Sequence, residues 1–412
     1  MAALAVALAL FVGAGPALDR CDQSAKALAW TERGARGQGP LEVGAAKVPL
    51  TPPFPVTLAG YGPPRAEATR AVVPLFARAV VLRRGQVRIG LVNADVLLIP
   101  EAVALEVRAK AASLGLTDVM VVATHAHSSF GGYDARLVSE VAALGRFQPA
   151  ARQVLVDALT RALKDAAARL APASLSTAEV EVPRLVRSRD SGQAPDPRLT
   201  RVLFSGASGP LAQLLLFSAH PTTAGRTPKG VDPDYPGRLA RAQEASGAGV
   251  TLFLPSAVGN GSAGVGGGPE KFARAVAQAL PAPHPPGLSG GTLSLDRARF
   301  TLPHPDADRL VPFGLQRITE DVLCQSTPAR PAVEVLELGG LTLVGVPGEA
   351  TFEAGRALEQ AVGPTARVVS LAGGYLGYIE TEAHVRAATG EAKRQYFGPE
   401  LLDRLLQALR TR

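Results

Sequence analysis

Three pairs of short apolar segments, each pair joined around glycine, constrain the fold of this chain most strongly. The length and spacing of each pair are those of a β-hairpin. The pairs are residues 76–82 with 87–92, residues 201–204 with 211–217, and residues 333–338 with 341–346. Segments with helical signals lie between the hairpins, at 100–113, 150–170 and 235–246. Because hairpins are mixed with strand–helix alternation, the sequence predicts an α/β fold, with a mixed β-sheet and helices on its faces.

The 412 residues are enough for one large domain or two ordinary ones, and no internal repeat or convincing linker follows residue 45. We therefore expect a single large domain over residues 46–412, preceded by an irregular arm at 18–45. The apolar segment Ala2–Ala14 is too short to span a bilayer but fits the apolar part of a signal peptide. Although no Lys or Arg precedes Arg20, we interpret residues 1–17 as a signal peptide or apolar tail. We expect export to the periplasm, the exterior or a membrane surface.

The composition, with 47% hydrophobic and 19% charged residues, is that of a globular protein. The net charge of +7 comes mostly from scattered arginines, and no basic segment is interleaved with aromatic residues. We therefore expect no nucleic-acid partner, whereas peripheral contact with an anionic membrane is compatible with the charge. Cys21 and Cys324 have no metal-type spacing; they could pair in an oxidising compartment, although nothing in the sequence requires it.

Two of the six histidines, His125 and His127, follow the apolar segment Val119–Ala123. That segment has the composition of a buried strand. Because side chains at i and i+2 of an extended chain point to the same side, both imidazoles should leave the strand toward one point. Imidazole pairs at such strand ends are common ligands of divalent metals, although two surface histidines in a polar loop would have the same spacing.

Other polar residues also follow short apolar strands and are flanked by glycine or proline. They are His220, Glu349, and Tyr375 with Tyr378, and the glycine-rich loop around Ser262 is a further candidate. Histidines with a carboxylate suit a catalytic zinc, which takes three or four such ligands and activates water. Plainer interpretations exist: Glu349 could cap the helix that follows it, and Tyr378 could simply pack.

Motifs in the same order resemble those of the neutral/alkaline non-lysosomal ceramidase family, over residues 43–399. The motifs are Leu58-Ala-Gly-Tyr61, Leu91-Val-Asn-Ala-Asp95, Ala123-Thr-His-Ala-His-Ser128, Phe217-Ser-Ala-His220, Asp234-Tyr-Pro-Gly237, Gly345-Val-Pro-Gly-Glu349 and Gly377-Tyr378. The resemblance implies the fold of the family's N-terminal catalytic domain. It also implies a zinc amidase that cleaves the N-acyl bond of ceramide or of another N-acylated lipid or small molecule. We do not expect the family's C-terminal immunoglobulin-like domain in this chain.

The resemblance further implies roles for individual residues. The residues that match the family's zinc ligands are His125, His220, Glu349 and Tyr378. His127 matches its second, catalytic histidine, and Ser262 falls at its active-site serine. On a looser alignment, Arg187 matches an arginine near the substrate.

Several positions depart from the family's pattern. Asn260 replaces the aspartate before the family's serine, and Pro221 replaces the glycine after the second zinc histidine. Without a gap, Gly390 stands at a substrate-side tyrosine of the family; a short insertion would bring Tyr396 there instead. Since glycine lacks both the hydroxyl donor and the aromatic wall, we expect an N-acylated small molecule in preference to long-chain ceramide.

Two other functions remain open at this point. The altered substrate positions also fit a non-catalytic lipid or glycan binder on the same fold. A different metal-dependent hydrolase is the other alternative, since a His-x-His pair opens several such sites. Here the pair is followed by Ser128-Ser129, where metallo-β-lactamase-like sites need Asp-His.

Overall fold

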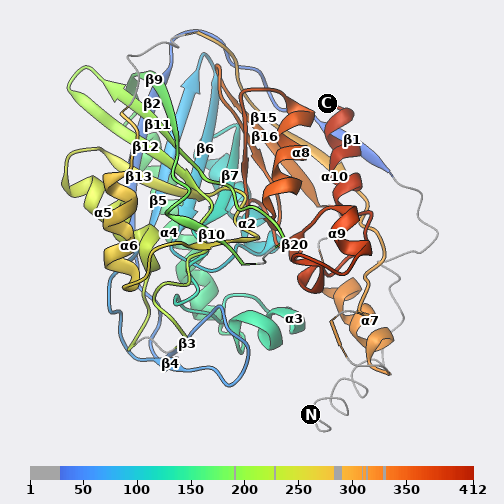
Figure 1. The fold of residues 1–412 in the computed structure, drawn as a ribbon. Coiled ribbons are helices and arrows are strands. Elements are labelled where there is room, and N and C mark those ends of the chain that lie inside the picture. Colours follow the sequence, from blue (N-terminus) through green and yellow to red (C-terminus); the bar gives the residue numbers. More distant parts are fainter. Residues whose placement is uncertain are drawn as a thin grey trace.

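The computed structural model describes residues 28–189, 192–226, 229–282, 290–308, 310–311, 314–327 and 331–412. The apolar segment 1–17, the start of the expected arm and Cys21 lie outside the described residues. Three main sheets and the helices packed on them make up the described chain (Figure 1). The predicted α/β class with helices on the sheet faces is confirmed, and the strands are divided among several sheets.

The first sheet contains the hairpin predicted at residues 76–92. Its strand order is β7 (Asp118–Ala123), β6 (Val87–Ala94), β5 (Leu75–Arg84), β2 (Glu42–Leu50) and β8 (Ala171–Pro172). The β6–β7 pair is parallel and the other pairs are antiparallel, so the sheet is mixed. Helices α2 (Glu101–Ser113) and α4 (Pro149–Ala167) pack on one of its faces.

The second and third sheets contain the other two predicted hairpins. The second has the order β13 (Val250–Pro255), β12 (Gly209–Phe217), β11 (Arg198–Gly206) and β9 (Ser174–Glu181). The third has the order β1 (Ala29–Glu32), β15 (Leu293–Phe300), β16 (Ala332–Leu338), β17 (Thr342–Gly345) and β19 (Ala366–Val369). Helices α5 (Asp234–Ala245) and α6 (Gly268–Gln278) cover the second sheet, and α8 (Phe352–Val362) and α10 (Leu401–Arg410) cover the third. Figure 1 shows these two helix pairs on opposite sides of the molecule.

The inner core lies where the first sheet faces the other two. Side chains of all three sheets share one buried cluster, to which β7 contributes Met120 and Val122. The alternate residues of β7, which are Val119, Val121 and Ala123, pack on the side of α2 and α4. Because both faces of this strand are buried, its sequence is continuously apolar and does not alternate. The layers therefore run helix, sheet, sheet, helix, and β7 ends inside this arrangement.

Short elements lie around the ends of the main strands. They are β3 (Val56–Thr57) with β4 (Glu67–Ala68), β10 (Val186–Ser188) with β14 (Gly261–Ala263), β18 (Glu349–Ala350) with β20 (Tyr378–Ile379), α3 (Leu137–Ser139) with the π-helical turn η1 (Glu140–Leu144), α7 (Gln316–Ser326), α9 (Glu382–Arg386) and the 3₁₀ turn η2 (Ala392–Arg394). Within the described ranges, every helix is too short or too polar to pass through a lipid bilayer.

The arm expected to be irregular at 18–45 contains regular structure where it is described. β1 pairs antiparallel with β15, and β2 begins at Glu42. β1 is an edge strand of four residues whose side chains are half-buried or exposed. Such a strand needs no apolar run, so hydrophobic patterning does not reveal it.

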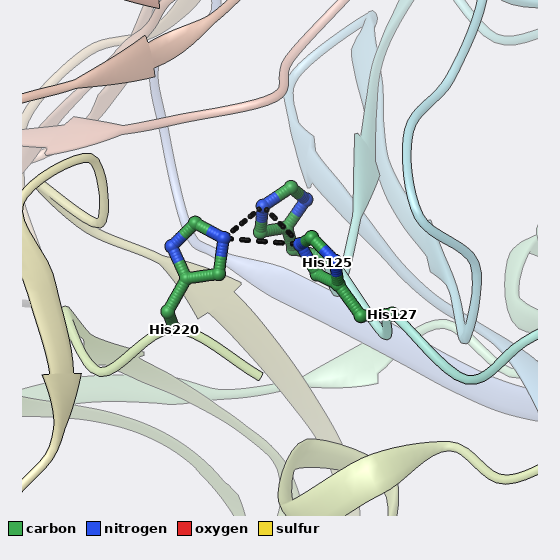
Figure 2. Close-up of side chains that lie close together, drawn as sticks. All are labelled: His125, His127 and His220. Atoms are coloured by element: carbon green, nitrogen blue, oxygen red, sulfur yellow. Dashed lines mark hydrogen bonds between the residues drawn. The ribbon is translucent and has the colours of Figure 1, made fainter. Parts of the chain in front are cut away.

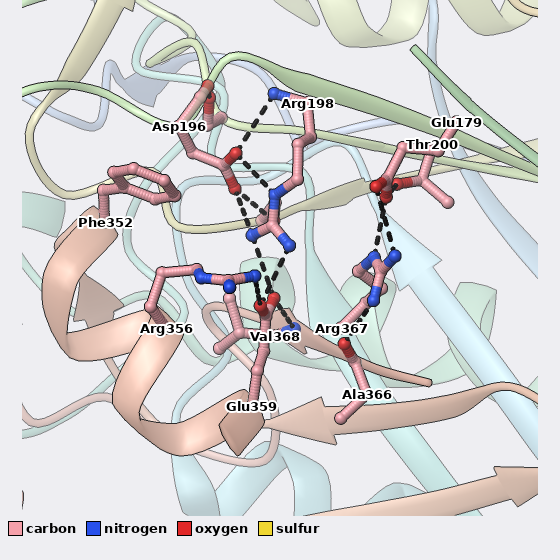
Figure 3. Close-up of polar contacts among 12 residues, drawn as sticks. Glu179, Asp196, Arg198, Thr200, Phe352, Arg356, Glu359, Ala366, Arg367 and Val368 are labelled. Carbon is pink, nitrogen blue, oxygen red and sulfur yellow. Dashed lines mark hydrogen bonds and ion pairs between the residues drawn. The ribbon is translucent and has the colours of Figure 1, made fainter. Parts of the chain in front are cut away.

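A buried ion network joins the second sheet to α8 (Figure 3). Arg198, at the start of β11, donates to the two carboxylate oxygens of Asp196 at 2.8 Å each and to those of Glu359 at 2.9 and 3.0 Å. Nearer the surface, Arg367 of β19 donates to Glu179 of β9. These contacts fix the third sheet against the second, and the candidate site depends on residues from both.

Candidate metal centre

Three imidazoles converge at one end of the sheets (Figure 2). His125 follows β7, His220 follows β12, and His127 lies two residues beyond His125. The Nε2 atom of His125 is 3.0 Å from that of His220 and 3.1 Å from that of His127. The Nε2 atoms of His127 and His220 are 3.0 Å apart. Three nitrogens this close, all directed at one place, could hold a metal ion.

The backbone that brings His125 and His127 together is a turn, not the extended chain expected from the sequence. β7 ends at Ala123, and His125 has a left-handed φ of 66°. The N–H of Thr124 donates to the Ala94 carbonyl at 3.0 Å, and that of Ala126 donates to the Val96 carbonyl at 3.2 Å. Hydrogen bonds to the end of β6 and the loop after it therefore hold a conformation that non-glycine residues rarely adopt.

A backbone carbonyl orients each imidazole from its far side. The Nδ1 atoms of His125, His127 and His220 lie 2.8, 2.9 and 3.2 Å from the carbonyl oxygens of Leu97, Gly60 and Val258, respectively. Because a carbonyl can only accept, Nδ1 of His125 and of His127 carries the proton, and their Nε2 lone pairs face the centre of the cluster. Nδ1 of His220 also lies 3.2 Å from Nη1 of Arg189, a group that can only donate. Burial and the neighbouring His125 ring lower the pKa of His127 to about 3, and burial also lowers the pKa of His220. Neutral imidazoles are the form that binds metals.

The backbone at Gly60 packs against the backbone of His127 so closely that only glycine fits there. Its φ is +91°, and a Cβ placed there would lie 2.6 Å from the Cα and carbonyl oxygen of His127. The close approach lets the Gly60 carbonyl accept from His127 Nδ1. It also places the ring of the next residue, Tyr61, 5.4 Å from the His127 ring.

Glu349 adds a buried carboxylate beside the histidines. Its Oε2 lies 3.4 Å from His125 Nε2 and 3.7 Å from His220 Nε2, yet it has no hydrogen-bond partner in the described part of the chain. Its Oε1 accepts from the Tyr375 hydroxyl at 2.7 Å. Burial acts to raise the pKa of Glu349, and positive charge on the His125 and His220 side chains acts to lower it. Glu349 lies in β18 and Thr351 is the N-cap of α8, so the interpretation of Glu349 as a helix cap does not apply.

Strand pairing places Tyr378 next to Glu349. The two residues are partners in the parallel bridge between β18 and β20. The Tyr378 hydroxyl accepts from Nη1 of Arg189 at 2.8 Å. Three imidazole nitrogens, a carboxylate oxygen without a partner and a nearby phenol form a donor set that fits zinc.

A cavity of about 380 Å³ opens over His125, His127 and Glu349. Its volume is in the range of small-molecule sites. Its aromatic wall consists of Tyr61, Tyr375, Tyr378 and Tyr396, its larger apolar side chains are Leu97, Leu98, Val138, Leu323 and Leu376, and its cations are Arg136, Arg189, Arg226 and Arg394. The metal donors therefore face a cavity with both apolar and cationic walls.

Two of the residues expected near the substrate lie elsewhere. Arg187 is exposed, its Nε donates to the Ala263 carbonyl at 3.1 Å, and it is not among the described residues that line the cavity. Arg189, two residues further on, occupies the cavity wall instead. Ser262 pairs with His220 in an isolated β-bridge. Its half-buried side chain is also not among the described residues that line the cavity.

Asn260 has a structural role that explains its departure from the aspartate of the family. Its Nδ2 donates to the Ala194 carbonyl at 3.0 Å, and its Oδ1 accepts from the Phe352 N–H, at the start of α8, at 2.9 Å. A carboxylate could not donate to Ala194. The amide therefore connects two segments next to the site.

The loss of an aromatic wall that we expected at Gly390 does not occur, because Gly390 is not among the described residues that line the cavity. A Cβ at Gly390 would lie 2.6 Å from Oε2 of Glu380 and 2.8 Å from Nε2 of Gln193, so the residue faces packed side chains. Tyr396 lines the cavity. A short insertion before Tyr396 therefore describes the chain better than the ungapped alignment does.

Arg189, Arg226 and Arg394 line the cavity but were not identified as site residues from the sequence, and Tyr396 was considered only as the alternative to Gly390. They lie in loops, or in the short turn η2, that no apolar run marks. Tyr61 and Tyr375 belonged to motifs that the sequence did single out, although without a role. Their place in the candidate site follows from their proximity to the candidate metal donors, which only the structure shows.

Comparisons with known proteins give one consistent result. A family profile described as neutral/alkaline non-lysosomal ceramidase, N-terminal, matches residues 41–250. Neutral ceramidase from Pseudomonas aeruginosa is 29% identical over an alignment of 202 positions, which covers 44% of this chain and 30% of that protein. The match thus spans about a third of the length of this curated relative.

Solved structures extend the likeness to most of the chain. A crystal structure of neutral ceramidase from Pseudomonas aeruginosa aligns with a TM-score of 0.71 and 22% identity, over 90% of this chain and 73% of that one. A ceramidase complexed with C2 aligns with a TM-score of 0.75 and 21% identity, over 90% and 74% of the two chains. At these identities the structural alignments establish a shared fold.

Proposed function

Because this chain belongs to the neutral/alkaline non-lysosomal ceramidase family, whose profile matches just over half of it, we propose that it is a zinc-dependent amidohydrolase that cleaves an N-acyl amide bond. The observation that supports this most directly is the unsatisfied donor set. Three Nε2 atoms and the partnerless Oε2 of Glu349 face one place in a buried site. Buried polar atoms without partners are rare unless a ligand satisfies them.

His125, His220, Glu349 and Tyr378 are the residues that would hold the metal. Zinc in this position supplies a Lewis acid for the amide carbonyl and lowers the pKa of water. Burial and the Glu349 charge raise the pKa of Tyr378 well above its ordinary value, and the Arg189 guanidinium, which donates to its hydroxyl, opposes that rise. The Tyr375 hydroxyl fixes the Glu349 carboxylate so that Oε2 remains directed at the histidines.

His127 differs from the other two imidazoles in its access to substrate. His125 and His220 are 1% and 0% exposed, whereas His127 is only partly buried and lines the cavity. In the proposed reaction His127 accepts a proton from the attacking water and returns it to the leaving amine. The Gly60 carbonyl holds its ring in the orientation that this transfer needs.

Ser262 is assigned a supporting role in the proposal. It lies next to His220 through the backbone, so its hydroxyl could donate to the oxyanion that develops on the amide carbonyl. Asn260 provides no base to activate it as a nucleophile, and the Asn260 amide is already hydrogen-bonded on both sides.

The proposed substrate is a ceramide-like lipid or another N-acylated molecule. One of the matched structures is that of a ceramidase complexed with C2, and this chain shares its fold. Since Tyr396 restores an aromatic wall where a glycine was expected, the cavity gives no reason on that side to disfavour ceramide. We further propose export and contact with a membrane surface, which cell fractionation with and without residues 1–17 would test.

Metal analysis of the purified protein, combined with a hydrolysis screen of N-acyl amides, tests the function. About one zinc per chain and release of fatty acid from N-acyl amides, including a short-chain ceramide, are expected. Zinc without hydrolysis, together with binding of lipid or glycan, would indicate a non-catalytic binder. Hydrolysis of phosphate esters but not of amides would indicate a different metal-dependent hydrolase. Absence of metal binding would overturn the proposal.

A further inference from the structure

The cavity over the metal centre is lined by far more positive than negative charge. Four guanidinium groups, those of Arg136, Arg189, Arg226 and Arg394, belong to its wall. Glu349 is the one acidic side chain among the described residues that line it. The Glu349 carboxylate faces the histidines, so it is engaged by the metal donors and not by the arginines.

The four arginines differ in the ion pairs that they form with carboxylates outside the cavity lining. Arg136 is paired with Asp134 at 2.7 Å. Arg394 is paired with Glu391, and the same carboxylate lies 4.0 Å from Nε of Arg189. Two guanidinium groups therefore share one carboxylate at this part of the wall.

Arg226 has no carboxylate partner among the described residues. Its guanidinium instead lies over the ring of Tyr61, 5.2 Å from the ring centre, and its side chain is exposed. An arginine held over an aromatic ring keeps its planar donors available to a ligand.

The cations lie close to the place where the scissile amide would bind. The Tyr61 ring, under Arg226, is 5.4 Å from the His127 ring. On the other side, Arg394 lies over the Tyr378 ring at 5.8 Å, and Arg189 donates to the Tyr378 hydroxyl. One tyrosine side chain therefore lies between Arg226 and His127, and Arg394 and Arg189 both contact the Tyr378 side chain directly.

The remaining wall is apolar and suits an acyl chain. Leu97 and Leu98 lie beside the histidines, and Val138, Leu323 and Leu376 extend the apolar surface. The cavity is thus amphipathic: it offers apolar surface to the acyl group and guanidinium groups to the rest of the substrate. A neutral head group would form no charge-assisted contact with the guanidinium groups, whereas an anionic one would.

We propose that the substrate is an N-acylated amine that bears an anionic group, a carboxylate or a phosphate, on its amine part. The inference rests on the proposed amidohydrolase function and specifies its substrate class. Arginine is the side chain best suited to bind both kinds of anion, and an excess of positive charge in a low-dielectric cavity concentrates anionic ligands there.

A matched substrate series tests the proposal on the zinc-loaded protein. The series keeps an octanoyl chain and varies the amine part: the ethanolamine amide is neutral, the glycine amide carries a carboxylate, the O-phosphoethanolamine amide carries a phosphate, and the (2-aminoethyl)trimethylammonium amide is cationic. We expect kcat/KM for an anionic member to exceed that for the ethanolamide by about 10-fold or more at low salt, and the advantage to shrink as salt rises. The comparison of glycine with O-phosphoethanolamine shows which anion the cavity takes.

Arg226→Gln tests the residue that lacks a carboxylate partner. It should reduce the anionic-to-neutral ratio of kcat/KM by about 10-fold, since one charge-assisted contact is lost. Arg161→Gln is the matched control, because Arg161 lies in α4 with its side chain 70% exposed and outside the cavity. That variant should keep the wild-type ratio.

Calorimetric binding of the same compounds separates this inference from the proposed function. If no member is hydrolysed, the amidohydrolase proposal fails, while tighter binding of the anionic members, weakened by Arg226→Gln, would still support the anionic ligand class. Equal binding and equal cleavage of the neutral and anionic members would overturn the inference and leave the amidohydrolase intact. A preference for the cationic member would also overturn it.

Discussion

Two buried polar clusters of this protein differ in whether their polar groups have hydrogen-bond partners. Around Arg198, four hydrogen bonds of 2.8–3.0 Å join the guanidinium to Asp196 and Glu359, and each oxygen of both carboxylates accepts at least one of them (Figure 3). Around His125, three Nε2 atoms face each other at 3.0–3.1 Å (Figure 2). Oε2 of Glu349, beside them, has no described partner. Both clusters are nearly inaccessible to solvent, so burial alone does not distinguish them.

The difference indicates what each cluster is for. A network whose donors and acceptors match is complete, and it connects β11 to α8. A buried cluster made of acceptors facing acceptors is unfavourable until something positive lies between them. The first cluster should therefore respond to changes in folding stability, and the second to metal.

The largest expected effect is removal of one imidazole from the metal centre. His220→Ala should lose most of the bound zinc, and N-acyl hydrolysis should fall to background, because a Lewis acid held by too few ligands dissociates. Elemental analysis and a fatty-acid release assay measure the two effects. Glu359→Ala provides the comparison, since it should retain zinc; a full complement of zinc in His220→Ala would show that the histidines are not ligands.

The second expected effect separates proton transfer from metal binding at His127. His127→Ala should lower turnover by about 10²–10⁴-fold, the range of general acid–base catalysis, while zinc content stays at one per chain. Because its Nε2 lies 3.1 Å from that of His125, His127 is also close enough to be a metal ligand. The zinc content of the variant therefore decides between the two roles. Loss of zinc in this variant would assign His127 to the ligands and leave the proton-transfer role to another group.

Much of the fold could be predicted because apolar runs mark doubly buried strands. The β5–β6, β11–β12 and β16–β17 hairpins were predicted in this way. β15 was missed because its sequence contains Asp296 and Arg297, which read as exposed. In the structure Asp296 pairs with Arg36 and Arg412, and Arg297 pairs with Asp118. Such long-range pairing permits charge within a covered strand, and local patterning carries no information about it.

The site could be predicted in part for the same reason. His125, His220 and Glu349 follow apolar strands, so hydrophobic patterning drew attention to them. Arg189 and Tyr396 come from segments without such a run, and Arg187 was chosen in place of Arg189. The charge of the cavity depends on which loop residues face it, and this follows only from the tertiary structure.

The third expected effect tests the satisfied cluster. Glu359→Ala should lower the free energy of unfolding by about 3–5 kcal/mol, because it removes the acceptor of three buried N–H groups, two on Arg198 and one on the Val368 backbone. Arg356→Ala is the matched control: Arg356 contacts the same carboxylate at 3.3 Å but is 47% exposed, so its loss should cost less than about 1 kcal/mol. Denaturant unfolding measures both values. Equal losses in the two variants would mean that burial does not set the strength of this network.

A smaller effect is expected at the hydroxyl that orients Glu349. Tyr375→Phe removes the 2.7 Å hydrogen bond to Oε1 and should weaken zinc affinity by about 10–100-fold, as for other groups that orient metal ligands. Competition with a zinc chelator gives the affinity. Tyr61→Phe, which alters a phenol of the same cavity that packs on His127, should leave the affinity near the wild-type value. An unchanged affinity in Tyr375→Phe would show that the strand pairing of β18 is sufficient to orient the carboxylate.

The smallest effect concerns the more exposed ion pair beside the Arg198 network. Burial alone would raise the pKa of Glu179, but hydrogen bonds from Arg367 and Thr200 hold it below its ordinary value. A carboxyl group whose pKa is lower in the folded state contributes stability above its unfolded pKa, about 4.3, and loses it as the pH falls through the folded value. Glu179→Gln should therefore cost about 0.5–1 kcal/mol at pH 7, because the pair is partly solvated, and the difference from wild type should shrink progressively below pH 4. Unfolding free energies of both proteins between pH 3 and pH 7 check this, and a difference that stays constant with pH would show that the carboxylate charge does not stabilise the fold.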